Sequence, residues 1–236
     1  RIAKISKNGG GIGCYLGILR AKGSSVNGAP NSAGPISQWV KIINDTAVAV
    51  NQSGKRKGAV TVALPWWHND ILDFLDMQTE HGDLRSKSFD VFPQIVVNDI
   101  FMKRDKAQEP IITFCPFEVK EKLGIEMYGL WGDAFEDAYE KIEAAFYPGK
   151  IKNARKIDSA RMLTKSVMKP MFDTGLPYTF FVDEVNRQNP NKHDGYIPCG
   201  NLCQESYSNV VADKYSHTCN LASIVLGNCD DMNDIA

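Results

Sequence analysis

The sequence predicts an α/β fold in which the strands pair in parallel. Segments with apolar residues at helical spacing alternate along the chain with short apolar runs rich in β-branched and aromatic residues. This alternation favours a parallel sheet with helices packed against it. The sequence shows no internal repeat and no low-complexity segment, so one continuous domain is expected.

The first half of the chain contains two predicted helices and three predicted strands. The first helix, at about residues 36–50, has apolar residues at helical spacing: Ile36, Val40, Ile43, Ala47 and Val50. Residues 59–64 (AVTVAL) are predicted to form a short buried strand, and residues 66–78 return to a helical period. Two more strands are predicted at 95–97 and 111–114, on either side of a charged stretch.

The second half begins with two longer predicted helices. One covers residues 133–146, and the other runs from about 158 to 172, with Asp158 as its N-cap and Gly175 just beyond its end. Aromatic and β-branched residues predict a strand at 178–182 (YTFFV). A polar loop at 186–200 then leads to a cysteine-rich end.

Composition excludes several classes of protein. The 27 basic and 28 acidic side chains leave a formal net charge of -1, which gives no general attraction to nucleic acid or to an anionic membrane. Hydrophobic residues make up 43% of the chain, as in ordinary globular proteins, and no apolar run approaches the ~18 residues of a membrane span. Six cysteines are too few for a disulfide-stapled secreted module, so a cytoplasmic location is expected. The chain begins at Arg1, and we expect it to be a piece of a longer protein.

The densest chemistry lies around Cys203. Asn201, Cys203 and Glu205 are spaced by two residues, and an extended segment would place all three on one side. They would offer a sulfur for thiol or radical chemistry, a carboxylate as general base and an amide to orient a hydroxyl. Cys219 follows in a second polar motif. Because buried unreactive cysteine is common, the spacing alone leaves a purely structural role open.

A structural zinc site is a competing interpretation of the same region. Four cysteines and two histidines fall close together in the sequence: Cys199, Cys203, Cys219, Cys229, His193 and His217. Structural zinc sites, however, usually take their ligands as two closely spaced pairs, and the second pair here is widely spaced.

Two glycine-containing segments could lie against a nucleotide. Gln52, Lys55 and Arg56 belong to a basic loop whose glycines would let phosphate approach, although the loop lacks the pattern of a Walker A motif. A solvated basic loop is the alternative. Glycines at 9–13, with Arg20 downstream, predict a tight turn against a ligand or a neighbouring backbone, because no strand precedes them as a dinucleotide site would require.

These clusters, in this order, resemble the large catalytic subunit of ribonucleotide reductases. Six motifs carry the resemblance: 8–13 (NGGGIG), 20–24 (RAKGS), 55–59 (KRKGA), 67–71 (WHNDI), 201–205 (NLCQE) and 219–223 (CNLAS). The resemblance implies that residues 1–236 are the central portion of a single catalytic domain, a ten-stranded α/β barrel, incomplete at both ends. It implies an oxidoreductase that reduces ribonucleotides to deoxyribonucleotides at the ribose 2′-hydroxyl, with a disulfide as acceptor.

The resemblance also implies a role for each candidate residue. Cys203 would become a thiyl radical that removes the ribose 3′-hydrogen, Glu205 would take the 3′-hydroxyl proton, and Asn201 would hydrogen-bond the sugar. Cys219 would be one of two thiols that reduce the sugar. The backbone near Gly10 would lie against the substrate. Four residues would belong to loops that sense a deoxynucleotide or ATP effector: Arg20, Gln52, Lys55 and Arg56.

Partners follow from the same resemblance. The substrate would be a ribonucleoside di- or triphosphate, and thioredoxin or glutaredoxin would be the reductant. The radical would come from a small subunit with a dimetal centre or, alternatively, from adenosylcobalamin, with no metal bound by this chain. We also expect a homodimer, completion by the remaining segments of the large subunit, and no turnover by the isolated chain. A non-catalytic nucleotide-binding fragment that assembles with a partner chain stays open.

Overall fold

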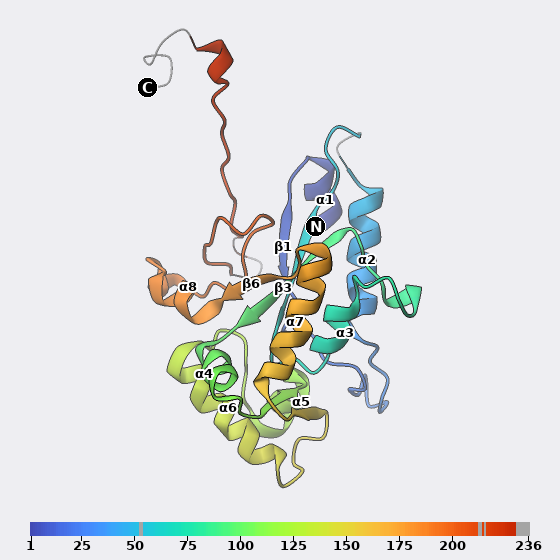
Figure 1. Ribbon diagram of the computed structural model, residues 1–236, viewed down its shortest axis with the longest axis vertical. Coiled ribbons are helices and arrows are strands. Elements are labelled where there is room, and N and C mark those ends of the chain that lie inside the picture. Colours follow the sequence, from blue (N-terminus) through green and yellow to red (C-terminus); the bar gives the residue numbers. More distant parts are fainter. Residues whose placement is uncertain (52–53, 212–213, 215, 230–236) are drawn as a thin grey trace.

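The centre of the molecule is a sheet of four parallel strands. The computed structural model describes residues 1–51, 54–211, 214 and 216–229. The sheet has the order β1-β2-β3-β6, formed by Ile12–Tyr15, Val60–Pro65, Val91–Val97 and Tyr178–Phe181. Helices connect the successive strands, so the predicted α/β architecture with parallel pairing is confirmed (Figure 1).

Helices and a small second sheet surround this centre. The helices are α1 (Ile2–Lys7), α2 (Ile36–Ala49), α3 (Ile71–Asp76), α4 (Asp99–Ala107), α5 (Pro116–Leu123), α6 (Gly132–Phe146), α7 (Ala160–Thr174) and α8 (Val182–Gln188). Strands β4 (Ile111–Phe114) and β5 (Ala154–Ile157) pair antiparallel. Short 3-10 turns lie at Leu84–Ser86, Lys192–Asp194 and Leu226–Asn228.

The two faces of the four-stranded sheet differ in what covers them. Because side chains alternate along a strand, Val62, Leu64 and Ile95 point to one side and enter the main apolar core. We call this side the helix face, since α2, α3 and α7 lie side by side along it (Figure 1). Ala63 and Val96 point to the opposite side, where they pack with Phe180 and Ile197 in a small second cluster.

We call this second side the loop face, because residues 197–204 cross it. Thr61 and Gln94 also belong to this face, and both are buried. Polar side chains at strand positions need hydrogen-bond partners when they are buried. The loop face therefore needs a polar partner, and the segment that follows Ile197 supplies it.

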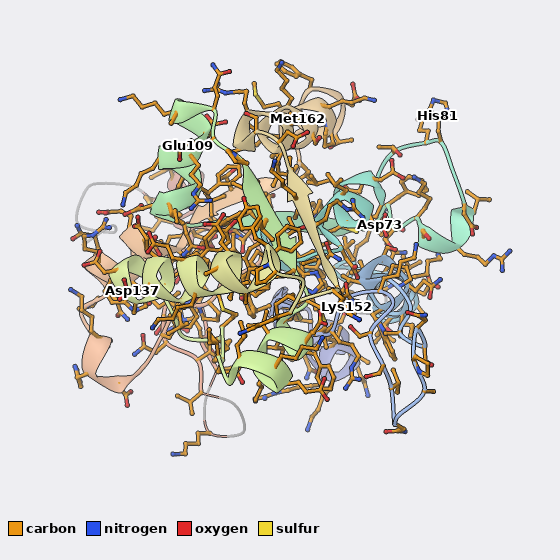
Figure 2. The ribbon with its side chains drawn as sticks, turned by 90° about the horizontal axis from the view of Figure 1, so that it is seen from below. Asp73, His81, Glu109, Asp137, Lys152 and Met162 are labelled. Atoms are coloured by element: carbon orange, nitrogen blue, oxygen red, sulfur yellow. The ribbon has the colours of Figure 1, made fainter. Side chains whose placement is uncertain are left out.

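Charged side chains occupy the outside of the molecule. Seen from below in Figure 2, Glu109, in the loop after α4, and Asp137, on α6, lie at the surface, and His81 stands on a loop away from the body. In the part of the chain that the structure describes, no helix is both long enough and apolar enough to cross a membrane.

Most predicted elements are present, with shifted ends. The helix predicted at 36–50, the helix at 133–146 and the strand at 111–114 are confirmed as α2, α6 and β4. The helix predicted at 66–78 is wrong in its first turn, because α3 begins only at Ile71. The backbone of Trp67 and Asn69 instead hydrogen-bonds to Phe114 at the end of β4.

The later elements also needed correction. The N-cap of α7 is Ser159, whose hydroxyl accepts from the N–H of Arg161, and not Asp158, while Gly175 ends the helix with a φ of +79° as expected. The predicted strand 178–182 stops at Phe181, because Val182 begins α8 inside what was expected to be mostly loop. α8 is short, and its polar residues hide the helical period, since the buried Asp183 and Asn186 occupy its inner side.

Candidate active site

A loop at residues 200–205, here called the cysteine loop, lies on the loop face of the sheet. The hydroxyl of Thr61 on β2 donates to the carbonyl of Leu202 at 2.8 Å. The carboxamide of Gln94 on β3 donates to the side chain of Gln204. The loop that carries Cys203 is thus attached to the two central strands.

Glycines at the start of β1 make room for this loop. A Cβ atom on Gly11 would lie 3.0 Å from Cβ of Leu202, and one on Gly13 would collide with the carbonyl of Gly200. Only a residue without a side chain permits such a close approach of two backbones. Gly10 instead lies against Ile5 of α1, where an added Cβ would be 2.7 Å from the Ile5 side chain. The prediction was a tight turn against a ligand or a neighbouring backbone. A close backbone neighbour is present, since Gly13 lies against the main chain of the cysteine loop, but Gly13 belongs to β1, and the turn itself packs on α1.

Three of the predicted catalytic side chains meet in one cluster. The Asn201 carboxamide hydrogen-bonds the Glu205 carboxylate, and the Cys219 thiol donates to Glu205 Oε1 at 3.5 Å. These interactions lower the pKa of Glu205 below its ordinary value. The hydrogen bond from Asn201 contributes most, and the positive charge of the nearby His217 contributes least. Glu205 is exposed, and with a pKa below the ordinary glutamate value its carboxylate is ionised at neutral pH and can accept a proton.

The expected extended geometry of this segment is wrong. Residues 202–205 form a series of bends, and Gln204 has a φ of +69°, in the left-handed region. The turn is closed by the Gln204 side chain, which donates to the carbonyl of Asn201 at 2.7 Å. Asn201 and Glu205 therefore meet because the chain turns back on itself, while Cys203 is exposed at the turn.

The residues of the alternative zinc site are not gathered together. Among the described residues, no three His, Cys, Asp or Glu side chains lie close enough to hold a metal ion. Cys199 is half-buried against the second apolar cluster, and this burial raises the pKa of its thiol to about 12. Cys219 lies on Glu205 instead.

The predicted effector residues fall at two ends of α2. The Arg20 guanidinium stacks over the Phe117 ring, 4.0 Å from its centre, and donates to the carbonyl of Ser25. Lys55 and Arg56 are exposed beyond the opposite end of the helix, and Gln52 lies outside the described residues. A helix of 14 residues is about 21 Å long, so one chain does not bring Arg20 and Lys55 together (Figure 1).

The loop that carries Arg20 is fixed by the motif around His68. The buried Asp70 carboxylate accepts from the N–H of Lys22 and the N–H of Ile36, at 3.0 Å each. His68 is fully buried, and its Nδ1 accepts from the N–H of Asp70, so Nε2 carries the proton and donates to the carbonyl of Leu19. Burial lowers the pKa of His68, which favours this neutral form. His68 therefore has a structural role, since both of its ring nitrogens are used in these hydrogen bonds.

A large cavity joins the Arg20 loop to the neighbourhood of the cysteine loop. It has a volume of about 1190 Å³, and its lining includes Gly13, Tyr15, Arg20, Phe117 and Cys199. Thr61, Gln94 and Tyr15 were not among the sequence-predicted site residues. A polar residue inside an otherwise apolar strand, as in VTVALP and VFPQIVV, was the signal that could have found the first two.

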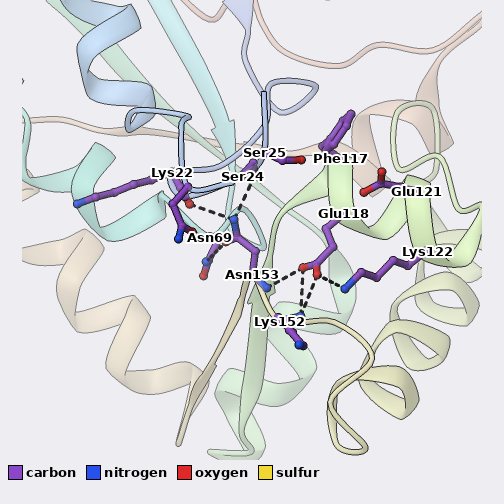
Figure 3. Close-up of a pocket in the computed structure, with 12 residues that line it drawn as sticks. Lys22, Ser24, Ser25, Asn69, Phe117, Glu118, Glu121, Lys122, Lys152 and Asn153 are labelled. Atoms are coloured by element: carbon purple, nitrogen blue, oxygen red, sulfur yellow. Dashed lines mark hydrogen bonds and ion pairs between the residues drawn. The ribbon is translucent and has the colours of Figure 1, made fainter. Parts of the chain in front are cut away.

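A second, smaller pocket lies between the Arg20 loop and α5 (Figure 3). It has a volume of about 480 Å³ and mixed charge, with Lys22 and Lys152 on its wall beside Glu118. Burial acts to raise the pKa of Glu118, but hydrogen bonds from Lys122 and from the N–H groups of Lys152 and Asn153 outweigh it and lower the pKa. Because Glu118 already has these donors, it serves to join α5 to the chain before β5.

Comparison with known proteins gives the same family over the whole chain. The family model described as "Ribonucleotide reductase, barrel domain" matches residues 1–235. A ribonucleoside-diphosphate reductase subunit alpha from Synechocystis sp. is 50% identical over 234 residues, which cover 99% of this chain and 30% of that protein. The Treponema pallidum protein of the same name is 38% identical over 259 residues, covering 98% of this chain and 30% of its own length.

A viral relative extends the comparison. A ribonucleoside-diphosphate reductase large subunit from Variola virus is 34% identical over 227 residues, covering 96% of this chain and 28% of that protein. The chain thus spans about 30% of the length of the curated relatives that it matches. With its parallel α/β sheet and its cysteine loop, the chain belongs to the ribonucleotide reductase barrel-domain family.

Proposed function

We propose that this chain carries the catalytic loop of a ribonucleotide reductase large subunit that acts on ribonucleoside diphosphates. The observation that supports it most directly is the cluster of Asn201, Glu205 and Cys219 around the turn that exposes Cys203. The names of the relatives support the diphosphate as substrate. We further propose that residues 1–236 are the central portion of one barrel domain.

In this proposal the side chains divide the reaction between them. The Cys203 thiyl radical takes the 3′-hydrogen of the ribose as a hydrogen atom and becomes a thiol again. Glu205, which is ionised at neutral pH, accepts the proton of the 3′-hydroxyl, and Asn201 donates a hydrogen bond to the sugar. Cys219 and a second thiol, which the resemblance places before the glycine turn, supply two electrons and two protons and end as a disulfide. One of these protons leaves with the 2′-hydroxyl as water, and the other becomes the new hydrogen at C2′. Glu205 then returns its proton, and Cys203 returns the hydrogen atom to C3′, which restores the thiyl radical.

The radical would reach Cys203 from outside the described residues. We propose a radical-generating small subunit with a dimetal centre, with adenosylcobalamin as the alternative source. The relatives are named as an alpha or large subunit, which supports a multisubunit enzyme. Thioredoxin or glutaredoxin would reduce the disulfide after each turnover. All six cysteines are unpaired in the structure, which fits a reducing cytoplasmic setting.

Effector control would involve two copies of the chain. Arg20 and the segment with Gln52, Lys55 and Arg56 would bind a deoxynucleotide or ATP, but they lie at opposite ends of α2. The outward side of α2 carries exposed apolar residues: Trp39, Ile42 and Val48. An exposed apolar helix side of this kind suits a partner. We propose a homodimer in which α2 packs against its copy, and in which the whole large subunit, not this chain alone, turns over.

The test uses the complete large subunit with its radical source. Cys203→Ser should lower ribonucleoside-diphosphate reduction by about 10³-fold or more, because serine supplies no thiyl radical, while effector binding stays intact. Cys229→Ser is the matched control, since the Cys229 thiol donates to the carbonyl of Val225, four residues earlier. Normal reduction by the Cys203→Ser enzyme would contradict the proposal.

A further inference from the structure

The cysteine loop is attached to the sheet by a pair of glutamine side chains. Gln94 is fully buried on the loop face of β3, and both ends of its carboxamide are used. Its Nε2 donates to Gln204 Oε1, and its Oε1 accepts from the N–H of Gly200 at 3.4 Å. A buried carboxamide is costly without partners, so the position of the loop and the position of Gln94 depend on each other.

Gln204 connects this anchor to the turn itself. Its φ of +69° lies in a region where glycine is favoured and residues with side chains are rare. The side chain nevertheless accepts from Gln94 and donates to the Asn201 carbonyl at 2.7 Å. A glycine would adopt this backbone conformation more easily but could form neither bond. The choice of glutamine therefore points to the side chain as the functional part.

The bonds of these residues surround Cys203 on both sides. The main chain is held at Gly200, Asn201 and Leu202 before the cysteine. After it, the carbonyl of Gln204 accepts from the Tyr207 hydroxyl at 2.7 Å. Cys203 itself stays exposed. Because the backbone on both sides of Cys203 is held, its sulfur keeps a fixed distance to a substrate bound over the loop face.

We propose that Gln94 and Gln204 are positioning residues that set the distance between the Cys203 sulfur and the hydrogen it abstracts. This inference rests on the proposed function. Hydrogen-atom transfer needs the two atoms in near contact, and a displacement of about 1 Å can lower a rate by about 10²-fold. The pair acts through the cysteine loop and touches no reacting atom.

The experiment compares four variants of the complete large subunit, assayed with its radical source and a ribonucleoside diphosphate deuterated at C3′. They are Gln94→Met, Gln204→Met, Gln204→Gly and the double Gln94→Met/Gln204→Met. Gln108→Met is the matched control, because Gln108 also has a positive φ, of +58°, but is exposed at the end of α4. For each variant, kcat/KM, the 3′-deuterium isotope effect on kcat/KM, effector binding and the thermal midpoint are measured.

Gln94→Met and Gln204→Gly should lower kcat/KM by about 10-fold to 100-fold and raise the isotope effect, because hydrogen transfer becomes the slow step. Effector binding should be unchanged. The double variant should be no worse than the worse single variant, since the two side chains act as one unit. Gln108→Met should stay within about twofold of the parent enzyme.

Two results would overturn the inference. Full activity of Gln204→Gly would show that only the backbone turn matters. A loss of kcat/KM with an unchanged isotope effect would show a loss of folded enzyme rather than a misplaced sulfur. If Gln94→Met fails to fold, the Gln204 variants decide, because Gln204 lies in a half-buried surface loop. Activity of Cys203→Ser would instead refute the proposed function, whatever the glutamine variants do.

Discussion

The helix face and the loop face of the same four strands are built from different chemistry. On the helix face, Val62, Leu64 and Ile95 are fully buried against apolar side chains of the helices. On the loop face, Thr61 and Gln94 are buried just as deeply, but against the backbone and side chains of the cysteine loop. Because side chains alternate along a strand, each of these strands contributes to the apolar core on one side and binds the cysteine loop on the other.

The helix face mainly stabilises the fold, whereas the loop face sets the geometry of the cysteine loop. Apolar contacts on the helix face have no preferred direction, so their contribution grows with the area that is buried. Hydrogen bonds on the loop face contribute less net free energy but have strict distances and angles. We therefore expect substitutions on the helix face to change the free energy of unfolding and substitutions on the loop face to change the rate of the reaction.

After Cys203→Ser, the largest effect on rate is expected at Glu205. In the complete enzyme, Glu205→Gln should lower kcat/KM by about 10²-fold to 10⁴-fold, because the amide cannot accept the 3′-hydroxyl proton. The free energy of unfolding should hardly change, since Glu205 is exposed. Glu140→Gln, at an exposed site on α6, is the control. If the Glu205→Gln enzyme kept the parental kcat/KM, the expectation that substitutions beside the loop face change the rate would be wrong.

The largest effect on stability is expected at Leu64. Leu64→Ala should lower the free energy of unfolding by about 2–5 kcal/mol, because it leaves a cavity in the core beneath the helices. The folded fraction should keep the parental kcat/KM. Urea unfolding, followed by assay of the refolded enzyme, measures both quantities. Leu84→Ala, at a leucine that is 71% exposed, should change stability by less than about 0.5 kcal/mol.

A smaller effect, on pH dependence, should come from Asn201. The Asn201 hydrogen bond is the largest cause that lowers the pKa of Glu205, so the acid limb of kcat/KM lies below the ordinary glutamate range. In Asn201→Ala the folded-state pKa rises, the carboxylate protonates at a higher pH, and the acid limb moves to higher pH. Profiles normalised to their own maxima separate this shift from the loss of the sugar contact. If the acid limb does not move in Asn201→Ala, then groups other than Asn201 lower the pKa of Glu205.

The regular helices and strands were predicted from the sequence better than the turns of the loop face. The helix α2 and the strand β4 follow from local apolar periods, which one stretch of chain contains by itself. The bend at Gln204 depends on Gln94, a residue 110 positions earlier, and no local pattern records such a contact. The candidate catalytic residues were named from motifs and stay a prediction, and the turn that brings Asn201 to Glu205 was wrongly predicted as an extended segment.

The attachment of the cysteine loop has a consequence for the order of folding. Its contacts to β2 and β3 join residues 141 and 110 positions apart, whereas α2 and α6 form from neighbours in sequence. Contacts between distant residues require closure of a long loop, so they form late and reduce the folding rate. The sheet must exist before the loop can dock on it. We therefore expect the cysteine loop to become ordered late in folding and to undock in local openings that leave the apolar core intact.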